Sequence, residues 1–156
     1  MRKGKTMQNK RRIRYAVVGM GALAQAAVLP AFANSGNSEL VALVTGNIEK
    51  GKKLARKFHA KHTFSYSEFS DCLCKAEVDA VYIVTPPGEH EKYAVAAANA
   101  GKHVLCEKPL AASVEQGQNM VDSCRRNHVL LMTAYRKYFE AASVRLKRLR
   151  ASSGRS

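Results

Sequence analysis

The sequence predicts an α/β fold, a three-layer doubly wound parallel sheet, on three observations. Short, wholly apolar segments recur along the 156 residues. Each is followed by a segment of helical composition, and several of these begin at a capping residue. Continuous apolar strands that alternate with helices are typical of a parallel sheet covered on both faces. The composition, 46% hydrophobic and 24% charged, is that of a globular protein.

The predicted elements alternate along the chain. Strands are expected at residues 15–19, 39–45, 61–64, 78–87, 103–109 and 129–135. Helices are expected at 22–34, 48–59, 67–75, 89–101 and 114–128. Pro30 has no N–H to donate, so it must kink the first helix or begin its last turn. Asn47, Ser67 and Ser113 can cap the helices that follow them, and Gly101 can end one.

The net charge of +14 is concentrated at the two ends of the chain. Residues 1–14 hold seven Lys or Arg and residues 145–156 hold five, with no acid in either segment. The part between them carries 14 basic and 12 acidic residues, so it is nearly neutral. Basic tails can bind nucleic acid, but solvated tails are commoner and nucleic acid is disfavoured as a partner. We assign 1–13 to a basic disordered tail, 14–138 to the folded domain and 139–156 to a crossing helix and truncated basic tail.

The four cysteines and the first 33 residues bear on localisation. The cysteines show neither a disulfide pattern nor the spacing of a zinc site, which favours reduced thiols in the cytoplasm. No metal and no membrane partner are expected. Residues 10–33 offer an alternative, since a basic start, an apolar middle and an Ala-x-Ala end resemble a secretory signal. Removing them would delete the first strand and helix of the predicted sheet.

A glycine turn joins the first strand to the first helix. Gly19 allows the tight turn, and Gly21 lets the backbone approach a pyrophosphate that rests on the helix N-terminus. Ala24 stands where the dinucleotide motif has its third glycine and still permits close packing of helix against strand. The strand before, the helix after and the second strand at the right distance together predict a dinucleotide site.

The end of the second strand indicates which dinucleotide binds. An NAD-binding sheet usually has an acid there to hold the ribose diol. This strand ends instead in Thr45, Gly46 and Asn47, with Lys50 close behind. A hydroxyl, exposed amides and an ammonium suit a 2′-phosphate, so NADP(H) is favoured, and NAD(H) stays open.

These motifs resemble those of the glucose-fructose oxidoreductase, inositol dehydrogenase and rhizopine-catabolism (Gfo/Idh/MocA) family. The matching stretches, in family order over about residues 13–145, are VVGMGALAQ, TGNIEK, DAVYIVTPPGEH, AGKHVLCEKPL and AYRKYFE. The resemblance implies a Rossmann dinucleotide-binding domain over 14–138 that holds NADP. The cofactor-binding residues that it implies are Gly19, Gly21, Ala22, Leu23, Ala24, Thr45, Gly46, Asn47, Lys50, Tyr66, Thr85, Pro86, Pro87, His90, Glu107, Lys108 and Arg136.

Each of these groups has an expected place. The glycine turn would cradle the pyrophosphate, and the segment after the second strand would hold the 2′-phosphate. Tyr66 would lie near the adenine or serve as a loop aromatic in the core. The segment from Thr85 to His90 would lie along the nicotinamide ribose, although His90 alone is more typical of a helix start than of a ligand. Arg136 would line the cofactor pocket.

Lys108 is the catalytic residue that the resemblance implies. It follows the apolar strand 103–106 together with Glu107, at the carboxyl end where ligands of such sheets bind. Its ammonium would favour a developing alkoxide on a sugar or polyol and relay the proton as hydride leaves the adjacent carbon.

The family's members are about twice as long, and their second domain supplies the substrate pocket. We therefore expect an NADP(H)-binding domain that is inactive alone, that acts on a sugar or polyol when a second domain is supplied, and that can associate with itself or a partner chain. A non-catalytic nucleotide-binding or regulatory module, a truncated gene product and a basic-tailed nucleic-acid binder remain the alternatives.

Overall fold

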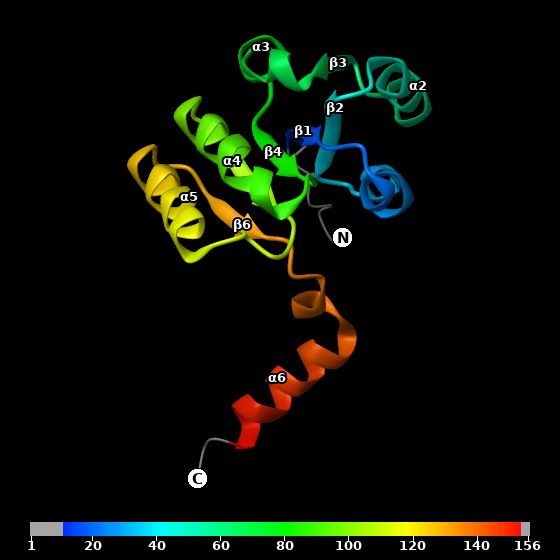
Figure 1. The fold of residues 1–156 in the computed structure, drawn as a ribbon. Helices are drawn as coiled ribbons and strands as arrows, with labels where there is room; N and C mark the ends of the chain where they lie inside the picture. Colours follow the sequence, from blue (N-terminus) through cyan, green and yellow to red (C-terminus); the bar gives the residue numbers. More distant parts are fainter. Residues whose placement is uncertain (1–10, 154–156) are drawn as a thin grey trace, which may run out of the picture.

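Six short apolar strands pair in parallel in the computed structural model, which describes residues 11–153 (Figure 1). The strands are β1 (Ile13–Val18), β2 (Ser38–Thr45), β3 (His62–Ser65), β4 (Ala80–Ile83), β5 (His103–Cys106) and β6 (Leu131–Thr133). Their order is β3-β2-β1-β4-β5-β6, with every neighbouring pair parallel. This order reverses direction between β1 and β4, which confirms the doubly wound fold predicted from the sequence.

Helices connect the strands. They are η1 (Ala24–Val28), α1 (Leu29–Ala33), α2 (Ile48–Phe58), η2 (Tyr66–Glu68), α3 (Phe69–Lys75), η3 (Pro87–Glu89), α4 (His90–Asn99), α5 (Val114–Arg126), η4 (Arg136–Phe139) and α6 (Ala141–Ser153). The predicted caps of α2 and α5 are confirmed, because the side chains of Asn47 and Ser113 each accept a hydrogen bond from the third residue on. The predicted cap Ser67 is wrong. Ser65 forms a capping box with Glu68 instead, and Ser67 lies inside the η2 turn.

The first helix shows how Pro30 is accommodated. The helical segment runs from residue 22 to residue 33, and its middle, η1, is π-helical. Pro30 then lies in the first turn of α1, where a missing N–H disturbs the backbone ladder least. The kink expected at Pro30 is therefore replaced by a π-helical turn that ends two residues before the proline.

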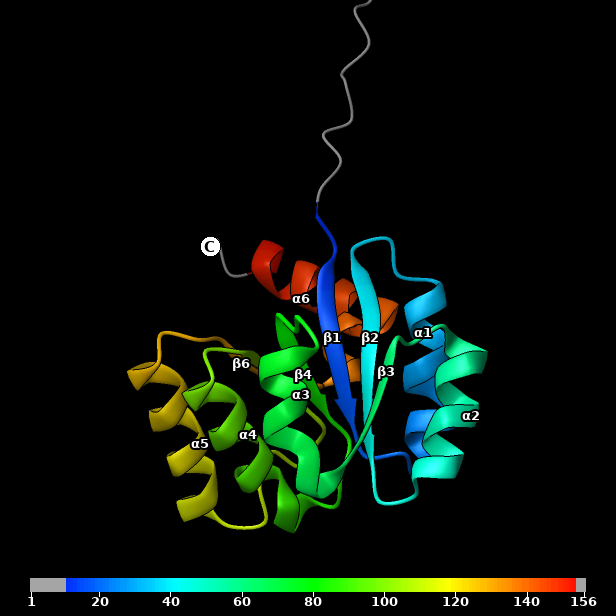
Figure 2. The ribbon, with the colours of Figure 1, turned by 90° about the horizontal axis from the view of Figure 1, so that it is seen from above.

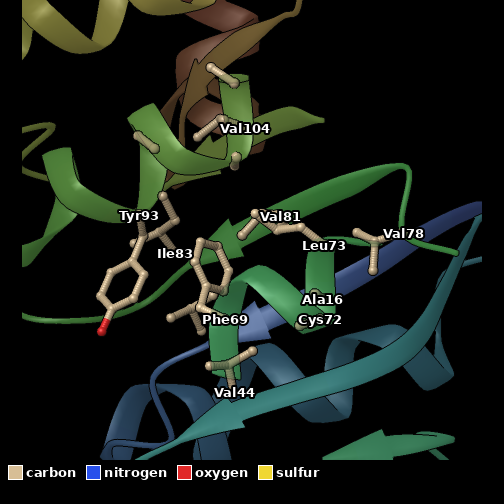
Figure 3. Close-up of a cluster of buried hydrophobic side chains, with 14 of the residues drawn as sticks. Ala16, Val44, Phe69, Cys72, Leu73, Val78, Val81, Ile83, Tyr93 and Val104 are labelled. Atoms are coloured by element: carbon tan, nitrogen blue, oxygen red, sulfur yellow. The ribbon is translucent and has the colours of Figure 1, made fainter. Parts of the chain in front are cut away.

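The two faces of the sheet are packed unequally. Helices α3, α4 and α5 lie on one face, and α1 and α2 lie on the other (Figure 2). The larger cluster of buried side chains lies under the first group, where Phe69 and Tyr93 meet edge to face with ring centroids 5.1 Å apart (Figure 3). The smaller cluster joins β1 and β2 to α1 and α2. The central strands β1 and β2 are therefore buried on both sides.

The doubly wound fold is as predicted, but on one face the helical cover over β4, β5 and β6 is incomplete. On the α1 side these strands present Tyr82, Leu105 and Met132, which are cross-strand neighbours in register. Met132 is 47% exposed, and Tyr82 and Leu105 are half-buried. Helices α1 and α2 pack over β1 to β3 on this side, and η4 borders the exposed part of the face. We call Tyr82, Leu105 and Met132 the open row.

The two ends of the described chain differ in how they contact the sheet. Strand β1 begins at Ile13, and Arg11 pairs with Asp79 at 2.8 Å, so residues 11–13 are ordered although the tail was expected to reach residue 13. The rest of that tail lies outside the described residues. Helix α6 contacts chiefly η4 and extends away from the sheet (Figure 1). Within residues 11–153, no helix has the length and apolar character needed to span a bilayer.

Candidate functional site

The carboxyl ends of β1, β2, β4 and β5 meet at one edge of the sheet, and Gly19 lies there directly after β1. Its φ is 97°, and a Cβ atom on this residue would lie 2.7 Å from the carbonyl oxygen of Val84. Its N–H donates to the carbonyl of Val44 at 2.9 Å. Both the backbone angle and the close contact exclude a side chain, so this position requires glycine.

Gly21 is constrained differently. A Cβ atom there would meet no atom within 4 Å, so its outer side is open. The helix begins at the next residue, with Ala22 and Leu23 exposed and Ala24 fully buried against the sheet. The turn therefore offers an open backbone surface beside the first N–H groups of a helix, which attract anions.

Two side chains close the glycine turn from within the protein. The amide of Gln25 donates to the carbonyls of Met20 and Gly21 at 2.9 and 3.1 Å. The ammonium of Lys50 donates to the same Met20 carbonyl at 3.0 Å. Lys50 thus links the segment after β2 to the glycine turn after β1. The role of Gln25 could not be recognised in the sequence, because a polar residue at that position simply interrupts an apolar run.

The segment after β2 is shaped by its own hydrogen bonds. Thr45 is buried, and its hydroxyl accepts from the Asn47 amide at 3.2 Å. The Asn47 side chain accepts from the Lys50 amide at 2.9 Å, while Gly46 is exposed. A Cβ atom on Gly46 would lie 3.2 Å from the Tyr66 ring, so this ring packs over the glycine. Thr45 therefore faces the core, and the exposed groups are Gly46, Asn47 and Lys50.

The loop after β4 lies next to the glycine turn. The amide nitrogen of Thr85 would be 3.0 Å from a Cβ atom on Gly19. The Thr85 hydroxyl is buried and has no hydrogen-bond partner among the described residues. Pro86 and Pro87 carry the chain into η3. His90 does not face the open edge, because it is 1% exposed and both its ring nitrogens lie against backbone carbonyls.

The residues after β5 differ in their surroundings. Glu107 accepts a hydrogen bond from the Tyr82 hydroxyl at 2.7 Å, and burial, reinforced by this bond, raises the pKa of Tyr82. Lys108 is exposed, and its ammonium has no partner among residues 11–153. The Lys108–Pro109 peptide bond is cis. Tyr82 was missed in the sequence, where it reads as one apolar residue of a buried strand.

A hollow of about 790 Å³ extends over the open row beside these residues. Its walls come from α1, β4, β5, β6 and η4, and Glu107, Lys108 and Arg136 also line it. Arg136 is highly exposed and lies 3.7 Å from Glu140. The structure therefore brings the glycine turn and the Thr85 loop to one edge, and places Lys108 and Arg136 at an open, largely apolar hollow.

Known proteins match this chain over most of its length. Residues 13–135 match the model of the GFO_IDH_MocA oxidoreductase family, NAD-binding Rossmann fold. A D-xylose 1-dehydrogenase [NADP(+)] from Haloarcula marismortui is 36% identical over 88% of this chain and 38% of its own length. A scyllo-inositol 2-dehydrogenase (NADP(+)) from Bacillus subtilis is 35% identical over 81% of this chain and 38% of its own.

Solved structures agree with these sequence matches. An aldose-aldose oxidoreductase from Caulobacter crescentus, crystallised with glycerol, superposes with a TM-score of 0.86 at 35% identity, over 91% of this chain and 43% of its own. A 3-ketoreductase from Actinomadura kijaniata, in complex with TDP-benzene and NADP, superposes with a TM-score of 0.82 at 26% identity, over 91% of this chain and 44% of its own. The chain thus spans about two fifths of the length of these relatives.

Proposed function

Because the chain belongs to the Gfo/Idh/MocA oxidoreductase family, we propose that it binds NADP(H) for hydride transfer to or from a hydroxyl-bearing carbon of a sugar or polyol. The observation that carries the proposal is the contrast between the two glycines of the turn. Gly19 is fixed against Val84, whereas Gly21 has open space where a Cβ atom would stand. A pyrophosphate placed there would meet backbone N–H groups at a helix N-terminus.

The preference for NADP(H) over NAD(H) is supported by the charges after β2. No carboxylate stands at the end of this strand, and the nearest acid, Glu49, pairs with Lys52 at 3.0 Å. Gly46, Asn47 and Lys50 are exposed there, and the Lys50 ammonium, which donates one N–H to Met20, has two more for a 2′-phosphate. Two relatives named above are NADP(+) enzymes, which agrees with this proposal.

Lys108 is the residue we propose for the proton transfer. Bound NADP(H) would supply or accept the hydride. In the reducing direction the ammonium of Lys108 donates a proton to the carbonyl oxygen while the carbonyl carbon gains the hydride. One carbon–hydrogen and one oxygen–hydrogen bond form as the π bond breaks. The oxidising direction reverses these steps, and the neutral amine of Lys108 then accepts the hydroxyl proton. Its position after β5, at the hollow, supports this role.

We further propose that this chain alone binds the cofactor but turns over little substrate. Lys108 is exposed, and an ammonium in water stabilises a developing negative charge far less than one in a dry site. Activity would require a substrate-binding region that covers the hollow, supplied by another part of the protein, a second copy or a partner chain. A non-catalytic nucleotide-binding module is the second candidate, and the same exposure favours it. Four free thiols support a cytoplasmic setting for either.

The first experiment tests binding through two of the glycines with open Cβ positions. NADPH fluorescence is titrated with the wild-type protein, Gly21→Ala and the control Gly36→Ala. A Cβ atom meets nothing within 4 Å at either glycine, so both variants should fold like the wild type. We expect Gly21→Ala to lose at least about tenfold in affinity for NADPH, because the new methyl group occupies the pyrophosphate position, and Gly36→Ala to lose nothing.

The opposing outcomes are distinct. Equal binding by Gly21→Ala and the wild type would show that no pyrophosphate lies on the turn. Failure of the wild type to bind either NADPH or NADH would remove the proposal altogether. A Lys50→Ala variant then addresses the choice of cofactor. It should weaken NADPH binding more than NADH binding, since the bond from Lys50 to the Met20 carbonyl supports the glycine turn for both cofactors. An equal loss for both would exclude Lys50 from recognition of the 2′-phosphate.

A further inference from the structure

His90 is an almost completely buried polar side chain close to the candidate site. It begins α4 and is 1% exposed. Its Nε2 atom lies 2.8 Å from the carbonyl oxygen of Thr85, and its Nδ1 atom lies 3.1 Å from the carbonyl oxygen of Leu110. The ring therefore bridges the loop after β4 and the loop after β5, and neither nitrogen is left for a ligand.

The two carbonyls do not depend equally on His90. A carbonyl only accepts, so each contact is a hydrogen bond only where the ring nitrogen carries a proton, and a ring with a single N–H donates to one carbonyl at a time. The Leu110 oxygen has a second donor, because the Cys106 thiol lies 3.8 Å away. Burial raises the pKa of this thiol to about 12, so it retains its proton. The described residues give the Thr85 oxygen no second donor. The shorter contact and this imbalance both favour the Nε2–H form, which donates to Thr85.

Thr85 is the point at which this bond reaches the candidate site. Its amide nitrogen and the Val84 carbonyl are the atoms against which Gly19 packs. Its hydroxyl is buried without a partner among residues 11–153, so it has unused hydrogen-bonding capacity beside the glycine turn. Since β4 adjoins β1 on the side opposite β2, Thr85 lies away from the segment after β2 and toward Lys108.

We propose that His90 is a positioning residue for the nicotinamide half of the dinucleotide. The Nε2–H of the ring holds the Thr85 carbonyl and thereby fixes the backbone of the loop that this half would follow. The inference rests on the proposed function, because it presumes that a dinucleotide crosses the edge from Gly46 toward Lys108. It assigns His90 an indirect role and places no ligand contact on its ring.

The test uses two amide side chains that keep different parts of the imidazole. In His90→Gln the amide nitrogen can reach the Nε2 position and donate to Thr85. In His90→Asn the shorter amide reaches only the Nδ1 position and donates to Leu110. Both variants exchange the same aromatic ring for an amide, but Asn is smaller by one buried methylene, so the free energy of unfolding of each is measured alongside. A general loss of packing would affect both ligands equally. NADPH and adenosine 2′,5′-bisphosphate are titrated with each, since the second ligand lacks the nicotinamide half.

We expect His90→Asn to bind NADPH about tenfold more weakly than the wild type, the loss of roughly one well-placed hydrogen bond. Its affinity for adenosine 2′,5′-bisphosphate should change by no more than about twofold on the same scale. His90→Gln should restore most of the NADPH affinity. Equal losses for both ligands would reduce His90 to a support of the fold, and unchanged NADPH binding in His90→Asn would overturn the proposal. Better NADPH binding by Asn than by Gln would also overturn it, by pointing to Leu110.

A measurement on the wild type keeps the inference testable even where a variant does not fold. The ring nitrogens of ¹⁵N-labelled His90 are followed by NMR during titration with each ligand. NADPH should shift the Nε2 resonance, and adenosine 2′,5′-bisphosphate should leave it in place. No shift with NADPH, while NADPH fluorescence reports binding, would reject the role of His90 and leave the proposed function standing. Absence of binding by the wild type would reject the proposed function itself.

Discussion

Two glycines within helices should respond in opposite ways to the same substitution. Gly51 lies in α2, where an added Cβ atom would stand 2.6 Å from a Thr45 methyl group and 2.7 Å from a Thr63 methyl group. Gly117 lies in α5, and there the same atom would meet the Cβ of Ala111 at an ordinary 3.8 Å. Glycine at position 51 is therefore required by the close approach of α2 to the sheet, and glycine at position 117 is not.

The size of the difference follows from two effects. Replacing glycine by alanine inside a helix stabilises the folded state by about 0.5–1 kcal/mol, and Gly117→Ala should retain this gain. At Gly51 the obstructing methyl groups belong to β-branched side chains with few alternative rotamers, and Thr45 is further held by its bond to Asn47. Overpacking costs about 1–3 kcal/mol, so Gly51→Ala should be destabilising by about 1 kcal/mol net.

Urea unfolding monitored by far-UV circular dichroism measures both free energies of unfolding. The two variants should differ by about 2 kcal/mol, which for a domain of this size is a separation of about 6 °C in midpoint temperature. Gly51→Ala should also weaken NADPH binding, because displacement of Thr45 moves the amides that follow β2. The reasoning is refuted if Gly51→Ala is as stable as Gly117→Ala, because the two threonine methyl groups would then leave space for a Cβ atom on residue 51.

Three further predictions concern residues in or next to strands β4, β5 and β6. The Arg14 guanidinium holds the pKa of Asp79 at about 2, below its usual 3.8, so Asp79→Asn should lower the free energy of unfolding at pH 7. In urea titrations, this difference from the wild type should vanish as the pH falls from about 4 toward 2. Tyr82→Phe should reduce the free energy of unfolding by about 1 kcal/mol, and no loss would mean that its bond to the carboxylate after β5 is unimportant. Val104→Thr should destabilise by about 1–2 kcal/mol and Met132→Thr by less than about 0.5, whereas equal losses would show that the open row is covered in solution.

Most of the fold is local enough to be predicted from the sequence. Caps such as Asn47 and Ser113 act on backbone groups three residues away, so a short stretch of sequence contains the whole interaction. The prediction of Ser67 as the cap overlooked an equally local signal, the Ser-x-x-Glu spacing by which Ser65 forms a capping box with Glu68. The open row could not be predicted, because Leu105 belongs to an apolar run whether or not a helix covers that face.

The residue types of the site could be predicted from the sequence better than the way each side chain faces. Gly19 and Gly21 follow from backbone requirements that a motif encodes. Thr45 and His90 were read as groups facing a nucleotide, but both are buried and form hydrogen bonds within the protein. The Thr45 hydroxyl bonds to Asn47 two residues on, whereas the His90 ring lies between Thr85 and Leu110, which belong to different loops. Whether either side chain faces a ligand or the protein depends on the packing around it, which no local pattern shows.

The hydrogen bonds at the carboxyl edge separate binding from chemistry. The ammonium of Lys50 holds the Met20 carbonyl at the glycine turn, and the ring of His90 holds Thr85 beside it. Each bond fixes a backbone surface through contacts that lie within this domain. Lys108, in contrast, is exposed at a hollow that residues 11–153 leave open on its outer side. Backbone donors act wherever the loop is rigid, so affinity for the cofactor should be largely independent of whatever covers the hollow. An ammonium stabilises charge strongly only where water is excluded, so turnover should depend on that cover.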